Sequence, residues 1–234
     1  MTPVAEEWAP KVGGRRLVVV GRNSAVWRQL QHHAAFAACA PLAISHADLD
    51  AFAFQPDDEV WLLSYVLDPA RNAAMIKQLH DAGVGRLVYL GSSSSIVHHR
   101  TRCYRYAEAK WLAEQQVLAL SGGFVLTVGR VIRQTTELPG GLNAVTSVDE
   151  LAAFMARPSW PSDGSRQRTL LRMVDRPFGS AIERVVFRAY GWLMTRTGFF
   201  PCLLRPLDLL LRACGWRWYG YVFLSNRIWA STTL

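Results

Sequence analysis

The sequence has no apolar run long enough to cross a membrane as a helix. A spanning helix needs about 20 consecutive apolar residues. The longest candidate, residues 198–211, is interrupted by Pro201, Arg205, Pro206 and Asp208. The chain also has no dense Lys/Arg tract, internal repeat or low-complexity segment. These absences argue against an integral membrane protein, a nucleic-acid-binding tail and a repeat architecture.

Cysteine is scarce and scattered. The four cysteines, Cys39, Cys103, Cys202 and Cys214, show neither a zinc spacing nor a disulfide framework. The histidine pairs 32–33 and 98–99 have no partner at metal-ligand spacing, so we expect no metal site. Because no secretory signal pattern is present either, we expect a protein of the reducing cytoplasm.

Basic and apolar residues are abundant. The chain has 234 residues, half of them hydrophobic (50%), and a net charge of +8. Its pI is about 9.7. This length suits one domain, or one domain with a small appendage, and a sizeable core. The charge suits anionic small molecules or a membrane surface as partners, and we expect no nucleic acid.

Strand and helix patterns alternate through the first two thirds of the chain. Continuous apolar runs typical of buried parallel strands occupy residues 17–20, 59–65, 86–91 and 124–128. Helical patterns with capping residues separate them, from 23 to about 38, from 68 to 83 and from 106 to about 122. Further along, residues 143–148 suggest a short strand, 149–156 a helix and 170–174 another strand. Such alternation predicts an α/β protein with a Rossmann-like, doubly wound parallel sheet.

The composition changes after this sheet pattern. We expect a polar leader over residues 1–14, a Rossmann domain over 15–155, and a small, mostly helical C-terminal extension over 156–234. In the sheet, Gly21, Ser64, Gly91 and Arg130 follow or end strands. Since open α/β sheets bind ligands beyond the carboxyl ends of their strands, these positions predict the binding site.

One stretch combines two side chains with acid/base chemistry. In Tyr106-Ala107-Glu108-Ala109-Lys110, the phenol and the ammonium are four residues apart and project from one helix face. A positive charge beside the phenol favours the phenolate, so we expect Lys110 to lower the pKa of Tyr106. A hydroxyl of the preceding serine loop, residues 92–95, can orient a substrate oxygen. The alternative is an ordinary surface Tyr and Lys on an amphipathic helix.

The ordered set of motifs resembles a known family. Residues 72–96 carry an early Asn72, then Ala-Gly-Val, a strand and a serine-rich loop; Tyr106, Lys110 and Glu114 follow, and residues 127–130 end a strand in Arg. This order is similar to the extended short-chain dehydrogenase/reductases, and more narrowly to the NAD-dependent epimerase/dehydratase family. The resemblance covers roughly residues 15–155.

The resemblance implies a nicotinamide cofactor, NAD or NADP, and hydride transfer at a hydroxyl or ketone of a nucleotide-sugar-like substrate. Tyr106 is then the general acid/base, and Lys110 lowers its pKa and bonds the nicotinamide ribose. Ser93, with Ser94 as the neighbouring alternative, orients the substrate oxygen. The cofactor-binding positions implied by the family are Gly21, Arg22, Asn23, Ser24, Asp48, Leu49, Leu63, Ser64 and Arg130.

The chain departs from the family in its phosphate loop and beside it. Three glycines of the family correspond to Gly21, Ser24 and Trp27, so the first helix must tilt away or Trp27 must point elsewhere. Tyr65 stands where the family has a small residue and is expected to crowd the cofactor. Arg22 either contacts a 2′-phosphate or is an ordinary exposed arginine. These departures support a second hypothesis, a catalytically silent Rossmann scaffold that acts through protein or membrane interactions in a glycan pathway.

The aromatic and arginine-rich residues 182–229 leave three interpretations open. They cap the active site, form a peripheral membrane surface at the inner face of the membrane, or pack on the sheet and on a second subunit. The resemblance also implies a homodimer formed through the helix that carries Tyr106 and Lys110.

Overall fold

The computed structural model describes residues 16–156, 164–197, 206–207, 209–211, 213–215 and 220–232. The leader expected over residues 1–14 lies outside this range. None of the helices in the described part of the chain is long and apolar enough to cross a membrane.

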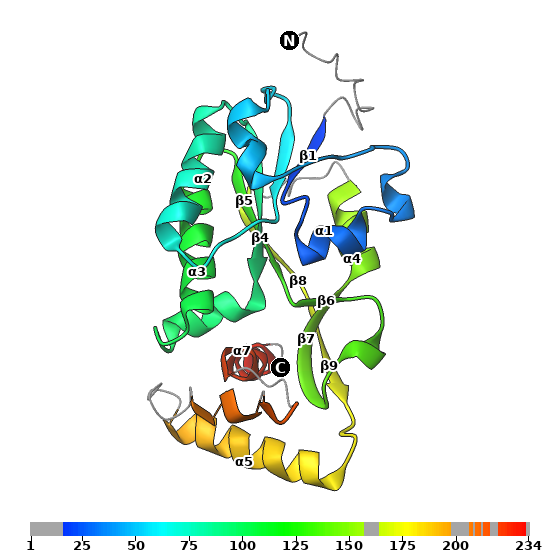
Figure 1. Cartoon of the computed structure of the whole chain (residues 1–234), viewed down its shortest axis with the longest axis vertical. Helices are drawn as coiled ribbons and strands as arrows, with labels where there is room; N and C mark the ends of the chain where they lie inside the picture. The colour runs from blue at the N-terminus through cyan, green and yellow to red at the C-terminus, as the bar shows by residue number, and fades with distance from the viewer. Residues whose placement is uncertain are drawn as a thin grey trace.

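Six parallel strands form the main sheet in the order β2-β1-β3-β4-β5-β8 (Figure 1). The strands are β1 (Leu17–Val20), β2 (Leu42–Ile44), β3 (Glu59–Leu62), β4 (Arg86–Ser92), β5 (Gly123–Val128) and β8 (Gln167–Leu170). The chain starts at β1 and winds outward in both directions, which places a topological switch point between β1 and β3. The predicted doubly wound parallel sheet is confirmed.

Helices cover both faces of this sheet and produce a three-layer structure. The helices α1 (Ala25–Leu30) and α4 (Val148–Ala156) lie over one face, and α2 (Pro69–Asp81) and α3 (Arg105–Ala119) lie over the other. Along β1, Val19 packs into the first core cluster, while Val18 and Val20 pack into the second. The period-two alternation of a strand therefore supplies both cores with β-branched side chains.

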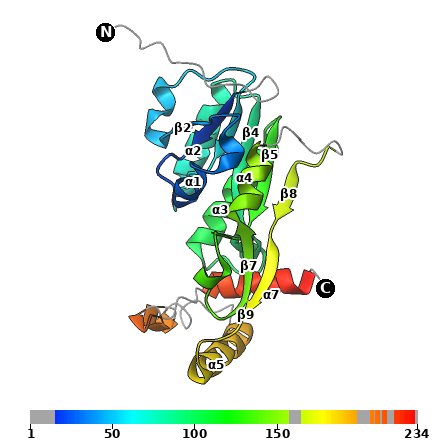
Figure 2. The same cartoon turned by 90° about the vertical axis from the view of Figure 1, so that its right-hand side faces the viewer.

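A smaller sheet and two further helices complete the described fold. The small sheet has the order β6-β7-β9, with β6 (Arg130–Ile132), β7 (Gly141–Ser147) and β9 (Arg172–Arg176). Helices α5 (Ala181–Thr197) and α7 (Gly220–Thr232) lie beyond the carboxyl ends of the main strands (Figure 2). Short 3-10 turns are η1 (Ala34–Phe36), η2 (His46–Ala51), η3 (Ser93–His99) and η4 (Thr135–Glu137).

Two sequence predictions of local structure were wrong. The first helix ends at Leu30 rather than near residue 38, because His33 adopts an extended conformation and its ring accepts the backbone N–H of Ala35 at the start of η1. The single strand expected over residues 170–174 is two strands, β8 and β9, separated at Leu171. Because β8 pairs with β5, the main sheet crosses the predicted boundary at residue 155.

Helix α7 is attached to the rest of the fold by side-chain hydrogen bonds. Ser225 Oγ and Trp229 Nε1 both donate to the Ser93 carbonyl oxygen, at 2.8 and 2.9 Å. The amide of Asn226 donates to Leu142 O at 2.8 Å and accepts from the backbone N–H of Ala144 at 3.1 Å. Helix α7 therefore connects the serine loop to β7.

Candidate active site

The Tyr106 and Lys110 side chains leave the same face of α3 and reach the end of β4. The Tyr106 hydroxyl donates to Ser92 Oγ at 3.4 Å. The Lys110 ammonium is buried and donates to the Leu90 carbonyl oxygen at 3.0 Å. The predicted helical pairing is therefore present, and it faces the serine loop.

Glu114, one turn further along α3, holds the start of the serine loop in place. Its Oε1 accepts the backbone N–H of Ser92 at 3.1 Å. A Cβ at Gly91 would lie 2.6 Å from this oxygen, so any larger residue at 91 would displace the Glu114 carboxylate from this position. Burial raises the pKa of the Glu114 carboxyl, and the charge of Lys110 acts in the opposite direction. Glu114 therefore fixes the position of Ser92.

The serine that meets Tyr106 is Ser92, one position before the residue chosen from the family pattern. Ser93 is the first residue of η3; it lines a neighbouring cavity and its carbonyl is bonded to α7. The role assigned to Ser93 stays a prediction. The sequence alone does not show which of four consecutive serines meets Tyr106. In the structure it is Ser92, the last residue of β4.

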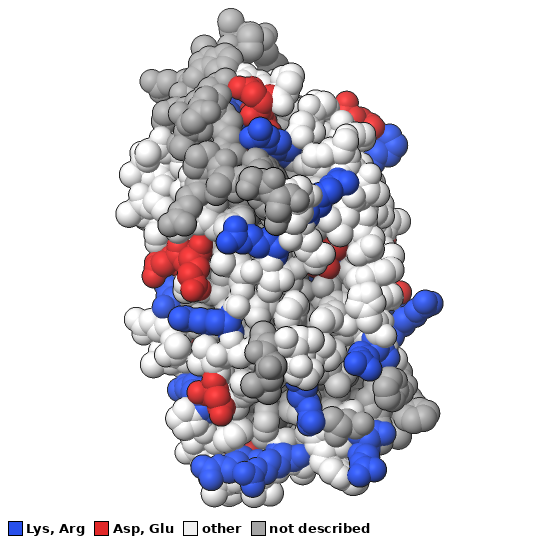
Figure 3. Space-filling view, turned by 180° about the vertical axis from the view of Figure 1, so that it is seen from behind, with Lys and Arg blue, Asp and Glu red and all other residues white. Residues whose placement is uncertain are grey.

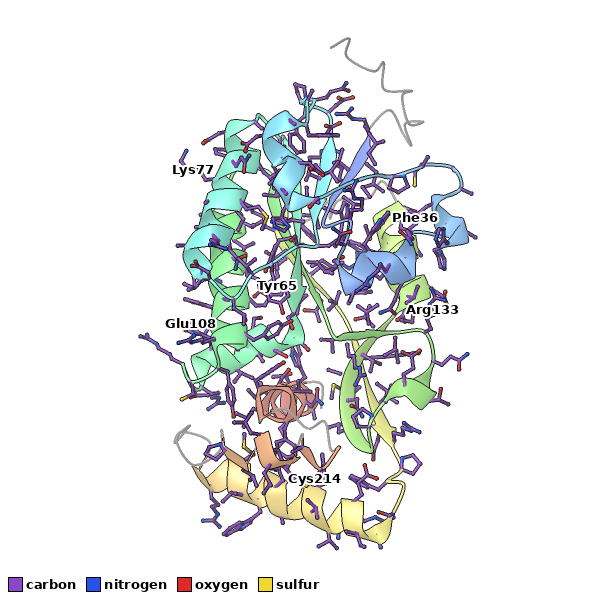
Figure 4. The ribbon with its side chains drawn as sticks, in the orientation of Figure 1. Phe36, Tyr65, Lys77, Glu108, Arg133 and Cys214 are labelled. Atoms are coloured by element: carbon purple, nitrogen blue, oxygen red, sulfur yellow. The ribbon has the colours of Figure 1, made fainter. Side chains whose placement is uncertain are left out.

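Aromatic rings enclose the Tyr106 side chain. The ring of Tyr65 meets that of Tyr106 edge-on, with 5.3 Å between centroids, and Tyr221 of α7 stacks on Tyr106 at 5.2 Å. The Lys110 Nζ atom also lies over the Tyr65 ring, 4.5 Å from its centroid. Figure 4 shows Tyr65 close to α3, near the carboxyl ends of the main strands. Tyr65 therefore contacts both members of the expected acid/base pair.

The expected lowering of the Tyr106 pKa is wrong for this structure. Burial raises the pKa of Tyr106 to about 12, although its hydrogen bond to Ser92 acts in the opposite direction. Burial likewise lowers the pKa of Lys110, against the opposing effect of the Glu114 charge. The reason is that burial away from water penalises the charged form of each group. The neutral phenol is therefore the stable form of Tyr106 at neutral pH.

A cavity of about 480 Å³ extends from the end of β1 to Tyr106 and Lys110. Eight residues expected from the sequence line it: Gly21, Asn23, Ser24, Leu63, Ser64, Tyr106, Lys110 and Arg130. Sequence reasoning missed Ser45 and His46, which follow β2 and also line it. These two residues directly follow the strand β2, and that position could have identified them as part of the binding site.

Three expected cofactor residues do not line this cavity. Arg22 and Asp48 form an exposed ion pair at 3.6 Å, and the Asp48 carboxylate also accepts the Ser45 backbone N–H. Leu49 is only 5% exposed and packs in the core under α2. Asp48 therefore caps η2 and Leu49 belongs to the core, and the cofactor contacts assigned to them stay predictions.

The turn after β1 keeps the close approach that the phosphate loop of a dinucleotide site requires. Gly21 has a φ of +122°, and a Cβ there would lie 2.9 Å from the Ser64 backbone nitrogen. Ser24 caps α1 by accepting the Trp27 backbone N–H at 3.0 Å. The Trp27 ring packs into the core against Phe36, with 5.8 Å between centroids, and does not line the cavity. The first glycine of the family loop is thus required, and Trp27 is accommodated in the core.

A second cavity of about 280 Å³ adjoins the first. The two share Ser92, Tyr106, Gly129 and Arg130. The second is otherwise walled by the start of η3, by the turn before β7, by β7, by α5 and by α7. These contribute Ser93, Ser94, Pro139, Gly140, Leu142, Asn143, Ala144, Phe187, Tyr221, Val222, Phe223 and Asn226. Helix α7 therefore caps the site, in agreement with the first of the three interpretations of the C-terminal region. Sequence reasoning did not single out Tyr221 or Asn226.

The charged groups around the two cavities are few. Arg130 is exposed, and in the described part of the chain no carboxylate forms an ion pair with it. No group of three His, Cys, Asp or Glu side chains among the described residues is placed to hold a metal ion. The site therefore offers a phenol, hydroxyls, an ammonium, a guanidinium and the imidazole of His46.

The sequence matches no protein-family model and no curated protein, whereas its structure matches solved ones. A short-chain dehydrogenase/reductase superfamily protein from Agrobacterium tumefaciens with bound NAD superposes with a TM-score of 0.51 at 14% identity, covering 77% of this chain and 83% of that one. A GDP-L-fucose synthetase from Naegleria fowleri bound to NADP has a TM-score of 0.50 at 10% identity, covering 70% and 74%.

At these identities the likeness concerns the fold. The order of the main strands, the helices on both faces and the site at the carboxyl edge all agree with it. This chain therefore has a Rossmann fold similar to that of these two proteins.

Proposed function

We propose that this protein is an NAD(P)-dependent oxidoreductase that reduces a ketone to an alcohol, with Tyr106 as the proton donor. The observation that carries the proposal is the place of Tyr106, which lines both cavities and bonds to Ser92 between them. Hydride transfer requires one acid/base group within reach of both the cofactor and the substrate. A surface tyrosine on an amphipathic helix would line neither cavity.

In the reductive direction Tyr106 acts as the proton donor, and in the reverse direction the same group takes the proton back. Because burial raises the pKa of Tyr106 to about 12, the hydroxyl holds its proton at neutral pH and can give it to the oxygen of a ketone. Ser92 orients the Tyr106 hydroxyl and offers its own hydroxyl to the same substrate oxygen. Glu114 and Gly91 keep the serine loop at this distance from α3.

The first cavity fits a nicotinamide dinucleotide at its phosphate end. Gly21, Asn23 and Ser24 present a tight turn and small polar groups there, and Arg130 contributes a positive charge. Lys110 lies at the other end, where the cofactor, when bound, supplies the hydride. Tyr65 occupies space at that end and must turn aside, which its 38% exposure permits.

The second cavity favours a compact substrate with an apolar or aromatic body. Phe187, Tyr221 and Phe223 line it, and the Asn226 amide is already bonded to β7. A nucleotide-linked sugar, the substrate class implied by the family resemblance, is the alternative within the same reaction. Arg130, which lines both cavities, is then the group expected to meet its phosphates.

One observation favours a second candidate function, a Rossmann scaffold without catalysis. Tyr65 packs against Tyr106 and lies under the Lys110 ammonium, so the acid/base pair is covered by a side chain of the protein itself. If Tyr65 does not move, neither group meets a cofactor. The protein would then act by binding other proteins or a membrane.

Titration of the purified protein with NADH and NADPH separates the two functions. Energy transfer from its nine tryptophans to the reduced nicotinamide reports binding. Micromolar binding that Lys110→Ala weakens and Tyr65→Ala strengthens is the expected result. Tyr106→Phe should keep cofactor binding and lose at least about 100-fold in ketone reduction, since it lacks the proton.

The opposite results reject the oxidoreductase. If neither cofactor binds at millimolar concentration, to the wild type or to Tyr65→Ala, the cavity is not a dinucleotide site. Binding to Tyr65→Ala alone would show that the Tyr65 ring closes the site, which supports the scaffold.

A further inference from the structure

The outer face of α5 carries an apolar stripe. Ile182 is 70% exposed, Val185 65% and Trp192 63%. Their spacing of three and seven residues places them on one side of the helix, together with the small Ala189. Large hydrophobic side chains at such exposure, aligned along two and a half turns, form a surface patch rather than scattered exposed residues.

Within the described residues, α5 is packed in the C-terminal core through the side opposite to this stripe. The opposite side of α5 carries Tyr190 and Met194, which are 3% and 1% exposed and pack with Leu211 and Phe223. The helix is therefore held in place through its inner side. Two more exposed leucines, Leu209 and Leu210, each 60% exposed, lie in the segment next to α5 at the same end of the molecule (Figure 2).

Positive charges accompany the stripe. Arg184 and Arg188 are exposed along one flank, and Arg196 is exposed in the last turn of α5. The acidic Glu183 is partly exposed and accepts the Gly179 backbone N–H at 2.8 Å. Basic side chains are visible along this lower end of the molecule in Figure 3. An apolar stripe edged by arginines is the pattern of a helix that lies in a membrane interface.

We propose that this outer face of α5 binds the surface of an anionic lipid membrane. In this arrangement the apolar side chains enter the headgroup region and the arginines meet lipid phosphates. A second copy of this chain is the other apolar occupant to consider. Pairing two such faces would bring their arginines together, whereas an anionic surface complements them.

The surface is independent of the proposed oxidoreductase chemistry, because none of its residues lines either cavity. It has a consequence for that chemistry all the same. The inner side of α5 contributes Phe187 to the second cavity, so a bound membrane lies one helix diameter from the place where the substrate is expected.

Flotation of the full chain with vesicles tests the proposal. Vesicles of phosphatidylcholine containing about one third phosphatidylglycerol should carry the protein, and vesicles of phosphatidylcholine alone should carry much less. Arg184→Glu/Arg188→Glu and Ile182→Ser/Val185→Ser should each lower the bound fraction about tenfold or more. High salt should weaken the wild-type binding, since it screens the arginines.

Matched variants on the Rossmann part serve as controls. Arg28→Glu/Arg71→Glu reverses two exposed arginines, and Leu67→Ser removes an exposed leucine (57%) from the loop before α2. Both should float like the wild type. Absence of flotation with the anionic vesicles, or an equal loss in the controls, overturns the proposal. A dimer seen by sedimentation without vesicles, which Ile182→Ser/Val185→Ser converts to a monomer, assigns the face to a second copy instead.

Discussion

The Rossmann part and the C-terminal part of this protein are held together by different interactions. In residues 16–156, apolar side chains fill both faces of the main sheet, and strand residues such as Val19 and Leu126 are fully buried. The helices α5 and α7 share a much smaller apolar cluster. Helix α7 depends in addition on hydrogen bonds from Ser225, Asn226 and Trp229.

This difference indicates that apolar burial supplies most of the stability, whereas hydrogen bonds fix the geometry of the site. Apolar burial is strong and non-directional, so it stabilises the sheet without specifying a cavity. Hydrogen bonds contribute less free energy but fix distance and direction. The candidate site lies where the two parts meet, with Tyr106 from one and Tyr221 from the other. Substitutions in the two parts should therefore have different consequences.

The largest effect is expected in the core of the main sheet. Leu126→Ala removes a fully buried side chain and should lower the free energy of unfolding by about 2–5 kcal/mol. Denaturant unfolding measures it. Leu209→Ala, the same change at a 60% exposed position of the C-terminal part, should stay within about 0.5 kcal/mol. Equal losses of unfolding free energy in the two variants would show that the two parts do not differ in apolar burial as described.

Two buried asparagines, one in each part, allow the same substitution to be compared in the two parts. Asn226 bridges Leu142 and Ala144 of β7, and Asn72 exchanges two hydrogen bonds with Val66 at 2.8 and 2.9 Å. Each change to Ala should cost about 1–3 kcal/mol, because backbone groups lose their partners. Hydrogen exchange should speed up in α7 and β7 for Asn226→Ala, and around Val66 for Asn72→Ala. The same exchange pattern in both variants would show that the two parts open together.

The ionisation of Tyr106 reports on the closure of the site between the parts. Burial raises its pKa to about 12, so its phenolate should appear well above the ordinary range near 10. The unfolded chain loses this proton first, so the contribution of Tyr106 to stability should fall as pH rises from 10 to 12. The difference in phenolate absorbance between the wild type and Tyr106→Phe measures the titration. Ionisation at or below 10 would mean that Tyr65 and Tyr221 do not shield the ring.

The smallest effect on stability is expected on the outer face of α5. Ile182→Ser should change the free energy of unfolding by less than about 0.5 kcal/mol, because the side chain is 70% exposed. Thermal unfolding without lipid measures this. A larger loss would show that the stripe belongs to the core of the C-terminal part rather than to a binding surface.

Sequence patterns predicted the four central strands of the main sheet because each of them is a local signal. The runs in β1, β3, β4 and β5 are apolar and bounded by turn residues, so periodicity and length identify them. The run Gln167–Leu170 is mostly exposed and polar, and β8 was therefore missed. Its place in the sheet depends on the distant β5, a long-range pairing that no local pattern encodes.

The site was predictable in part for the same reason. Gly21, Ser64, Lys110 and Arg130 meet at one cavity because parallel strands end at one edge. The contribution of α7 was not predictable, since Tyr221 reaches Tyr106 across more than a hundred residues. The shifted pKa of Tyr106 follows from burial by such distant rings, whereas the sequence showed only the neighbouring Lys110.

The two hydrogen bonds on the Ser93 carbonyl also bear on the order in which parts of the site form during translation. Their donors, Ser225 and Trp229, follow Ser93 by 132 and 136 residues. At ordinary rates of translation the ribosome needs on the order of ten seconds to make that stretch. Through this interval a nascent chain already has its central strands, but the wall over Tyr106 has not been made. The newly synthesised protein therefore acquires its complete site only after the sheet that supports it has been translated.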